Sequence, residues 1–188
     1  MNSITDEIKN DVAEYFISDS REFLFRYQKL REFQTHISNR SKLMIDLIFS
    51  IECSLKAIIF LESTEDEKAV YKKIKTHDLK KLSALVVDKS GLAGLEQSII
   101  DNSDLYNVSS RYTLDANINF RENNVLGKLY YDTIANFEWL DKLSEVAQDV
   151  LNFAKSKTSS EIKITNMGDL DLENLIEKAE RINNISKP

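Results

Sequence analysis

The stretch Ile51-Glu52-Cys53-Ser54-Leu55-Lys56-Ala57-Ile58-Ile59-Phe60 decides the fold of this chain. It lies within a longer run from Ser41 to Glu62, in which apolar residues occupy more than half of the circumference of a helix. A helix with this distribution is stable only when neighbouring elements cover most of its surface. We therefore expect the segment from Ser41 to Glu62 to be the central, most buried helix of the protein.

Apolar residues recur at three- or four-residue intervals along most of the remaining chain, which is typical of amphipathic helices. The chain has only four glycines, and its one proline is Pro188, so it lacks the frequent turn residues of strand-rich folds. The sequence predicts an all-α antiparallel helical bundle. Besides the central helix, the expected helices run from Thr5 to about His36, from Glu67 to Ile74, from Leu79 to Val86, from Leu92 to Ile100, from Asp104 to Tyr112, and from Leu126 to Ala154.

The domain organisation follows from a change of composition near the C-terminus. Residues 1–156 are expected to form the bundle, and residues 157–188 a linker followed by a short helical appendage that begins at Asp169. Within this tail, Glu161 to Thr165 alternates like a short strand, although a lone strand is marginally stable. The tail is expected to pack on the bundle or on a second subunit.

Composition excludes several classes of protein. No apolar run reaches the ~20 residues of a membrane span, and the polar start is unlike a signal peptide, so we expect a cytoplasmic protein without a membrane partner. The single cysteine, Cys53, rules out an internal disulfide and a cysteine-based metal cluster, and no metal or cofactor is expected. A net charge of −6 disfavours tight non-specific binding to long nucleic acids. Local basic patches are compatible with an anionic ligand.

Three sequence blocks occur in a fixed order: the apolar run 51–60, then Thr76-His77-Asp78-Leu79, then Ser110-Arg111-Tyr112. In this order they resemble the HEPN family of small helical-bundle domains, and the resemblance covers roughly Ser41 to Ala154. It implies a homodimer with the functional residues in a shared cleft. Relatives serve in bacterial toxin–antitoxin pairs, phage-exclusion systems and RNA processing, and as nucleotide-binding partners of nucleotidyltransferases.

The resemblance also indicates which residues would bind a ligand. HEPN ribonucleases carry an arginine followed after four to six residues by a histidine, but here Asn117 stands six residues after Arg111 and no histidine follows. An asparagine side chain cannot act as a general base, so this alignment predicts binding without cleavage. Arg111 and Tyr112 resemble the Arg-Tyr pair of the binding-type branch, in which they would contact a phosphate and a base. Further expected ligand contacts come from Lys75, His77, Asp78 and Asn117.

The same residues also have structural interpretations, which remain open at this point. Arg111 could pair with Glu52 or Asp78 inside the bundle, and His77 could orient its neighbours. Glu52 and Lys56 are four residues apart on the central helix, a spacing that favours a structural ion pair.

The expected function is a nucleotide- or RNA-binding module of a bacterial defence, toxin–antitoxin or stress system, without catalysis of its own. One alternative is a metal-independent endoribonuclease, an RNase toxin with an Arg/His pair at a dimer cleft. It would use Arg31 and His36, which have the Arg-four-His spacing at an early position, or another composite site. A second alternative is a helical interaction module for a protein such as a cognate antitoxin.

Overall fold

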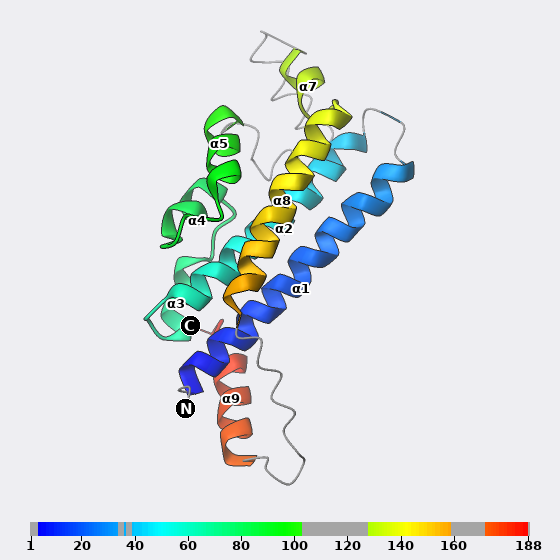
Figure 1. Ribbon diagram of the computed structural model, residues 1–188. Helices are drawn as coiled ribbons and strands as arrows, with labels where there is room; N and C mark the ends of the chain where they lie inside the picture. Colours follow the sequence, from blue (N-terminus) through cyan, green and yellow to red (C-terminus); the bar gives the residue numbers. More distant parts are fainter. Residues whose placement is uncertain (1–3, 34–35, 37–38, 103–127, 159–171, 188) are drawn as a thin grey trace.

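The computed structural model describes residues 4–33, 36, 39–102, 128–158 and 172–187, and these residues form helices without any strand. The all-α bundle is therefore confirmed for this part of the chain. Figure 1 shows the helices α1 (Ile4–Phe33), α2 (Arg40–Glu62), α3 (Glu67–Lys73), α4 (Leu79–Leu85), α5 (Ala93–Asn102), α7 (Lys128–Asp132), α8 (Phe137–Lys157) and α9 (Leu172–Asn184). The expected helix over Asp104–Tyr112 and the alternating segment Glu161–Thr165 lie outside the described residues.

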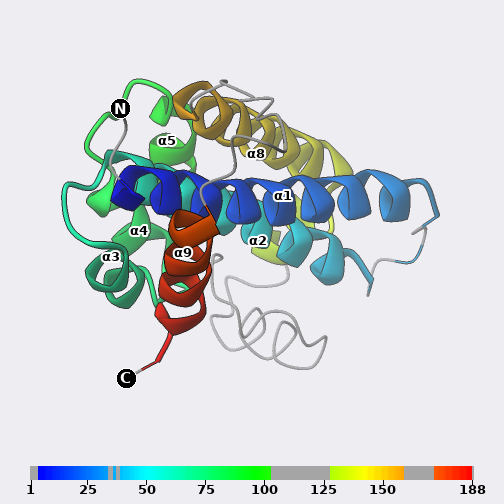
Figure 2. The ribbon, with the colours of Figure 1, turned by 90° about the horizontal axis from the view of Figure 1, so that it is seen from below.

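Three long helices, α1, α2 and α8, form the body of the bundle (Figures 1 and 2). Helices α1 and α2 make the most extensive helix–helix contact, and α8 packs against both. The shorter helices α3 and α4 contact α2 from another side, α5 contacts α4 and α8, and α9 runs across the direction of α1. The two ends of the described chain lie at the same end of the bundle (Figure 1).

The expected single helix from Leu126 to Ala154 is wrong, because the structure contains two helices separated at Thr133–Asn136. Asn136 ends the connection, since its side-chain oxygen accepts a hydrogen bond from the Glu138 amide at 2.9 Å and thereby caps α8. Ile134 and Ala135 are buried within the turn. Their apolar side chains therefore continue the helical spacing in the sequence across the break, which explains why the sequence predicts one helix. The part of the expected helix before Lys128 lies outside the described residues.

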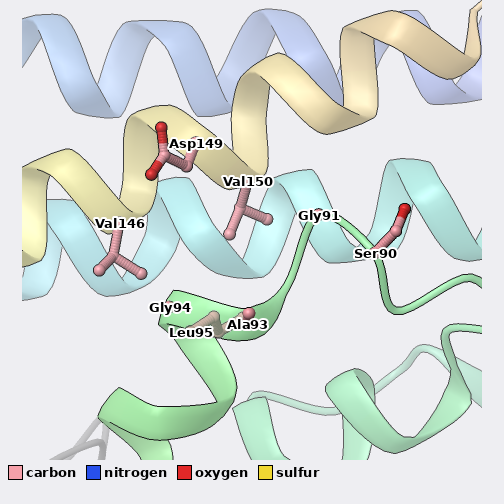
Figure 3. Close-up of a pocket in the computed structure, with 8 residues that line it drawn as sticks. All are labelled: Ser90, Gly91, Ala93, Gly94, Leu95, Val146, Asp149 and Val150. Atoms are coloured by element: carbon pink, nitrogen blue, oxygen red, sulfur yellow. The ribbon is translucent and has the colours of Figure 1, made fainter.

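A close approach joins the loop before α5 to α8. Figure 3 shows the groove between them, with Val146 and Val150 on α8 facing the start of α5. Gly91 lies against the Phe153 ring, and a Cβ atom built on Gly91 would be 2.2 Å from Cγ of Phe153. A residue without a side chain is therefore needed at this position for α5 to reach α8.

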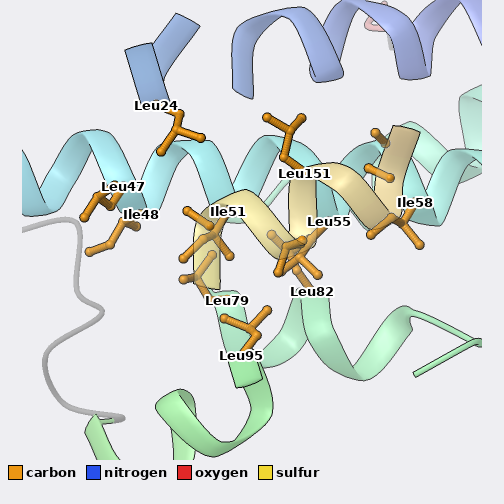
Figure 4. Packing of buried hydrophobic residues seen from close by; sticks show 14 of the residues in the cluster. Leu24, Leu47, Ile48, Ile51, Leu55, Ile58, Leu79, Leu82, Leu95 and Leu151 are labelled. Atoms are coloured by element: carbon orange, nitrogen blue, oxygen red, sulfur yellow. The ribbon is translucent and has the colours of Figure 1, made fainter. Parts of the chain in front are cut away.

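The hydrophobic core is centred on α2, as the sequence predicts. Sixteen of the 23 residues of this helix are buried, including Ile51, Leu55 and Ile58. Figure 4 shows how the other helices cover it, through Leu24 from α1, Leu79 and Leu82 from α4, Leu95 from α5 and Leu151 from α8. Contributions from four different helices explain why a helix that is apolar on most sides is stable here.

Several buried polar side chains of α1 are hydrogen-bonded to α2 or to its C-terminal end. The Ser20 hydroxyl lies 2.7 Å from the Ser54 hydroxyl and 3.0 Å from the Ser50 hydroxyl, which small side chains permit because they let the helices approach closely. Lys9 is 5% exposed, and its ammonium group donates to the carbonyl of Ser63 at the end of α2. A cation at a helix C-terminus is stabilising, so Lys9 fixes the start of α1 against the end of α2.

We expect Gly91→Ala to lower the free energy of unfolding by about 1–3 kcal/mol, because the added methyl group overlaps the Phe153 ring. Urea denaturation followed by circular dichroism measures this loss. Gly94→Ala is the matched control: its added Cβ meets only Val146 Cγ2 at 3.8 Å, so this change should be neutral or stabilising by up to about 1 kcal/mol. Equal effects of the two substitutions would contradict the packing described here.

Candidate functional site

A hollow of about 230 Å³ opens between α1, α2, α3 and the connection from α3 to α4. It brings together three of the groups that the sequence singles out, Lys56, Lys75 and His77. Two aromatic side chains, from Phe16 on α1 and Tyr71 on α3, complete the wall. The full lining consists of Phe16, Lys56, Tyr71, Ile74, Lys75, Thr76 and His77.

The local sequence holds the Lys75-Thr76-His77 segment in place at both of its ends. Ile74 caps the C-terminus of α3 and is 1% exposed, so it anchors the segment in the core. Asp78 caps the start of α4 by accepting a hydrogen bond from the Lys81 amide at 3.1 Å, and this bond lowers the pKa of the Asp78 carboxyl. Asp78 therefore has a structural use in this conformation, while the residues before it face the hollow.

Glu52 is the carboxylate on which the site is built. It is 4% exposed, yet it comes from a mostly apolar helix, so its charge must be compensated. Lys56 Nζ lies 2.6 Å from Glu52 Oε1, an i,i+4 ion pair within α2. His77 Nδ1 lies 3.0 Å and 3.1 Å from the two carboxylate oxygens. One buried acid thus links a lysine and a histidine that are far apart in sequence.

The contact with Glu52 sets the direction of the imidazole of His77. An ionised carboxylate can only accept hydrogen bonds, so Nδ1 is the ring nitrogen that donates. The side chain is 66% exposed, which leaves Nε2 as the ring nitrogen that a ligand can reach. Glu52 therefore acts as an orienting group for His77, which lines the hollow and keeps its outer nitrogen accessible.

Aromatic rings and cations alternate along the face of α1 and α2 next to the hollow. The Phe49 ring lies 6.5 Å from the His77 ring and the Phe23 ring 5.2 Å from that of Phe49, between ring centroids. The Arg26 guanidinium is 5.5 Å from the Phe23 centroid, and Lys56 Nζ is 6.0 Å from that of Phe16. Aromatic faces with adjacent cations are a typical surface for bases and phosphates of single-stranded nucleic acids.

The contacts of Arg31 are structural and do not direct it at a nucleic-acid ligand. Its Nε and Nη2 donate to the two Asp141 carboxylate oxygens, each at 3.1 Å, and its guanidinium lies 3.6 Å from the Phe137 centroid. Tyr27 donates to the same carboxylate at 2.6 Å. Burial raises the pKa of Asp141, but the hydrogen bonds from Arg31 and Tyr27 outweigh it and lower the pKa overall. Arg31 thus links α1 to α8.

His36, the proposed partner of Arg31, lies in the connection between α1 and α2 with an exposed side chain. Three further residues predicted to bind a ligand, Arg111, Tyr112 and Asn117, lie outside the described residues. Phe16 and Tyr71 line the hollow but are not predicted as site residues from the sequence. Phe16 fits the apolar periodicity of its helix, so no local signal separates it from an ordinary core residue.

Cys53 lies beside Glu52 on α2 and is only partly buried. Burial is the main cause that raises the pKa of its thiol to about 12, and the nearby carboxylates of Glu52 and Asp19 contribute in the same direction. A thiol with this pKa carries almost no thiolate at neutral pH. Cys53 is therefore unsuited to act as a nucleophile, and it does not belong to the lining of the hollow.

No family model, curated protein or solved structure matches this chain. Among the described residues, no cluster of histidine, cysteine and acidic side chains is arranged to hold a metal ion. In the same part of the chain, no helix combines the length and apolarity needed to cross a membrane. The geometry around Glu52 is therefore the feature that bears on function.

The orientation of His77 can be measured directly. In long-range ¹H–¹⁵N spectra of the neutral ring, we expect the Nδ1–H tautomer in the wild-type protein, because Glu52 accepts from that nitrogen. Glu52→Gln removes the charge assistance and should shift the population toward the Nε2–H tautomer. Glu65→Gln is the control, since Glu65 pairs with Lys73 on the surface. A tautomer that does not respond to Glu52→Gln would show that the contact is not formed in solution.

Proposed function

We propose that this protein is a HEPN-like nucleotide- or RNA-binding module of a bacterial defence, toxin–antitoxin or stress system, working as a homodimer beside a cognate nucleotidyltransferase or antitoxin. The observation that supports the binding role is the buried Glu52 carboxylate that holds Lys56 and His77 at one wall of a hollow that Lys75 also lines. The proposal describes binding and requires no catalytic step.

The charge balance of the hollow favours an anion. Glu52 neutralises Lys56, and Lys75 then adds one positive charge at the rim, which becomes two when His77 is protonated. Lys56 and Lys75 provide ammonium donors, and Thr76 provides a hydroxyl. Phosphate oxygens are the acceptors that such a set of donors binds best among common biological anions.

The size of the hollow restricts how a nucleotide would lie. At about 230 Å³ it is smaller than the ~300–1,000 Å³ of enclosed small-molecule sites, so it accommodates a phosphate with part of the sugar. The base would rest on the adjoining aromatic face, where Phe49 and Phe23 are half-buried. Such an open arrangement suits a nucleotide at the end or within a single strand of RNA.

The proposal predicts a specific pattern of weakened binding. Lys75→Ala should raise the Kd for a short single-stranded RNA by roughly 5- to 10-fold, because a charge-assisted contact to phosphate is lost. Fluorescence anisotropy of a labelled oligonucleotide measures the Kd. Adenosine monophosphate, added as an unlabelled competitor in the same assay, tests binding of a single nucleotide. Lys80→Ala is the control, since Lys80 is an exposed lysine of α4 outside the hollow. Equal effects of the two substitutions, or no binding by the wild type, would refute the proposed site.

A second candidate function, the metal-independent endoribonuclease, is favoured by one observation. A carboxylate that holds histidine Nδ1 and leaves Nε2 facing a ligand is the arrangement of an oriented general base. Nε2 would take the proton of a 2′-hydroxyl as its oxygen attacks phosphorus. The bond from phosphorus to the 5′-oxygen would break, and that oxygen would take a proton from water.

Incubation of end-labelled RNA with the purified protein separates the two candidates. We expect the RNA to remain intact while it binds, as the binding role requires. Cleavage to 2′,3′-cyclic phosphate ends that stops in His77→Gln but persists in His36→Ala would instead establish the endoribonuclease at the Glu52–His77 site. Cleavage that stops only in Arg31→Ala and His36→Ala would place the activity at the α1–α2 connection.

A further inference from the structure

Helix α9 is attached to the bundle by its charged side. Arg181 donates to both Glu67 carboxylate oxygens at 2.7 Å and to the Thr5 hydroxyl at 3.0 Å. Lys178 Nζ lies 2.6 Å from the Asp11 carboxylate. Glu67 is 7% exposed, and its hydrogen bonds with Arg181 lower its pKa, so this pair is a defined attachment. Only Ile182 and Ile185 add partly buried apolar contact.

Among the described residues, nothing covers the apolar side of α9. Leu172, Leu175 and Ile176 are 68%, 44% and 59% exposed, and none of the residues of α9 is buried. These three residues are at the start of α9, which projects away from the bundle in Figure 1. An amphipathic helix normally directs its apolar stripe at the core, and here the stripe faces solvent.

Carboxylates border this stripe along one edge, where Glu177 and Glu180 also line a hollow together with Glu67 and Lys68 of α3. Glu173, Glu177 and Glu180 follow one another at helical spacing along that edge, whereas the cations Lys178 and Arg181 point to the bundle. Glu177 retains a distant contact to Arg181 at 3.7 Å, and the other two glutamates are exposed. We call the set Leu172, Leu175, Ile176, Glu173, Glu177 and Glu180 the α9 face.

The charge of the α9 face argues against pairing with a second copy. In an antiparallel pair of identical helices, the same edge of each helix faces the other, so the glutamate edges of the two copies would meet. In a parallel pair, the glutamate edge of one copy would face the opposite edge of the other copy. The bundle already covers that opposite edge through Lys178 and Arg181. Like charges along such an edge cost affinity, so the face is better suited to a different sequence.

We infer that the α9 face binds a basic amphipathic helix of a partner protein. Its apolar residues would cover Leu172, Leu175 and Ile176, and its lysines or arginines would face Glu173 and Glu180. This is the helix-in-groove type of recognition, in which apolar anchors supply affinity and the flanking charges select the partner. The surface is separate from the Glu52 site and does not depend on the proposed nucleotide binding.

Designed peptides test this inference on the full chain. The probe is a fluorescent helical peptide of about four turns, with leucines along one stripe and lysines along both edges. Its counterpart has glutamates at the edges, and a third peptide has serines in place of the leucines. We expect the lysine peptide to bind at least roughly tenfold tighter than either of the other two, with weaker binding at high salt.

Substitutions in the protein identify the surface. Leu175→Ser with Ile176→Ser should weaken binding of the lysine peptide at least roughly tenfold, whereas Ile100→Ser, at a 74% exposed position on α5, should leave it unchanged. Glu173→Lys with Glu180→Lys should reverse the preference in favour of the glutamate peptide. Circular dichroism checks that each variant is folded.

Two results would overturn the inference. The first is equal binding of the lysine and glutamate peptides, or binding that the α9 substitutions do not change. The second is concentration-dependent dimerisation in sedimentation experiments that Leu175→Ser with Ile176→Ser abolishes, because the face would then be an interface between copies of this chain.

Discussion

The burial of α2 is the constraint from which most of the structure follows. A helix that is apolar on most of its circumference needs cover from several directions, and here α1, α4, α5 and α8 supply it. The helices must also approach closely: the serines allow this between α1 and α2, and the glycine before α5 allows α5 to reach α8. The positions of the shorter helices are therefore a consequence of what α2 must bury.

The same constraint creates the candidate site. Glu52 and Lys56 are charged residues on this buried helix, and a charge inside a protein must be paired and hydrogen-bonded to be tolerated. The structure meets this requirement by bringing the segment after α3 over the edge of α2, where His77 joins the pair. The hollow, its cations and the oriented imidazole thus arise where a polar group interrupts the central apolar helix.

Charged contacts also position the outer parts of the molecule. Arg31 and Asp141 link α1 to α8 at one end of the bundle, and Arg181 and Glu67 attach α9 at the other. Both are paired arginine–carboxylate contacts with two hydrogen bonds, a geometry that fixes orientation as well as distance. The use of Arg181 in this way turns α9 so that its apolar stripe faces away from the core.

The sequence by itself determined the helical class and the central position of α2, because apolar periodicity depends on residues within one or two turns. It also placed Glu52 and Lys56 at a spacing at which the two side chains meet. The tertiary structure decided that Glu52 reaches His77, that Arg31 is bound to Asp141, and that α9 exposes its apolar stripe. The chain also turns at Asn136, where buried Ile134 and Ala135 continue the apolar pattern through a non-helical segment. Each of these outcomes depends on contacts between distant segments, and local spacing contains no information about which distant partner a side chain will meet.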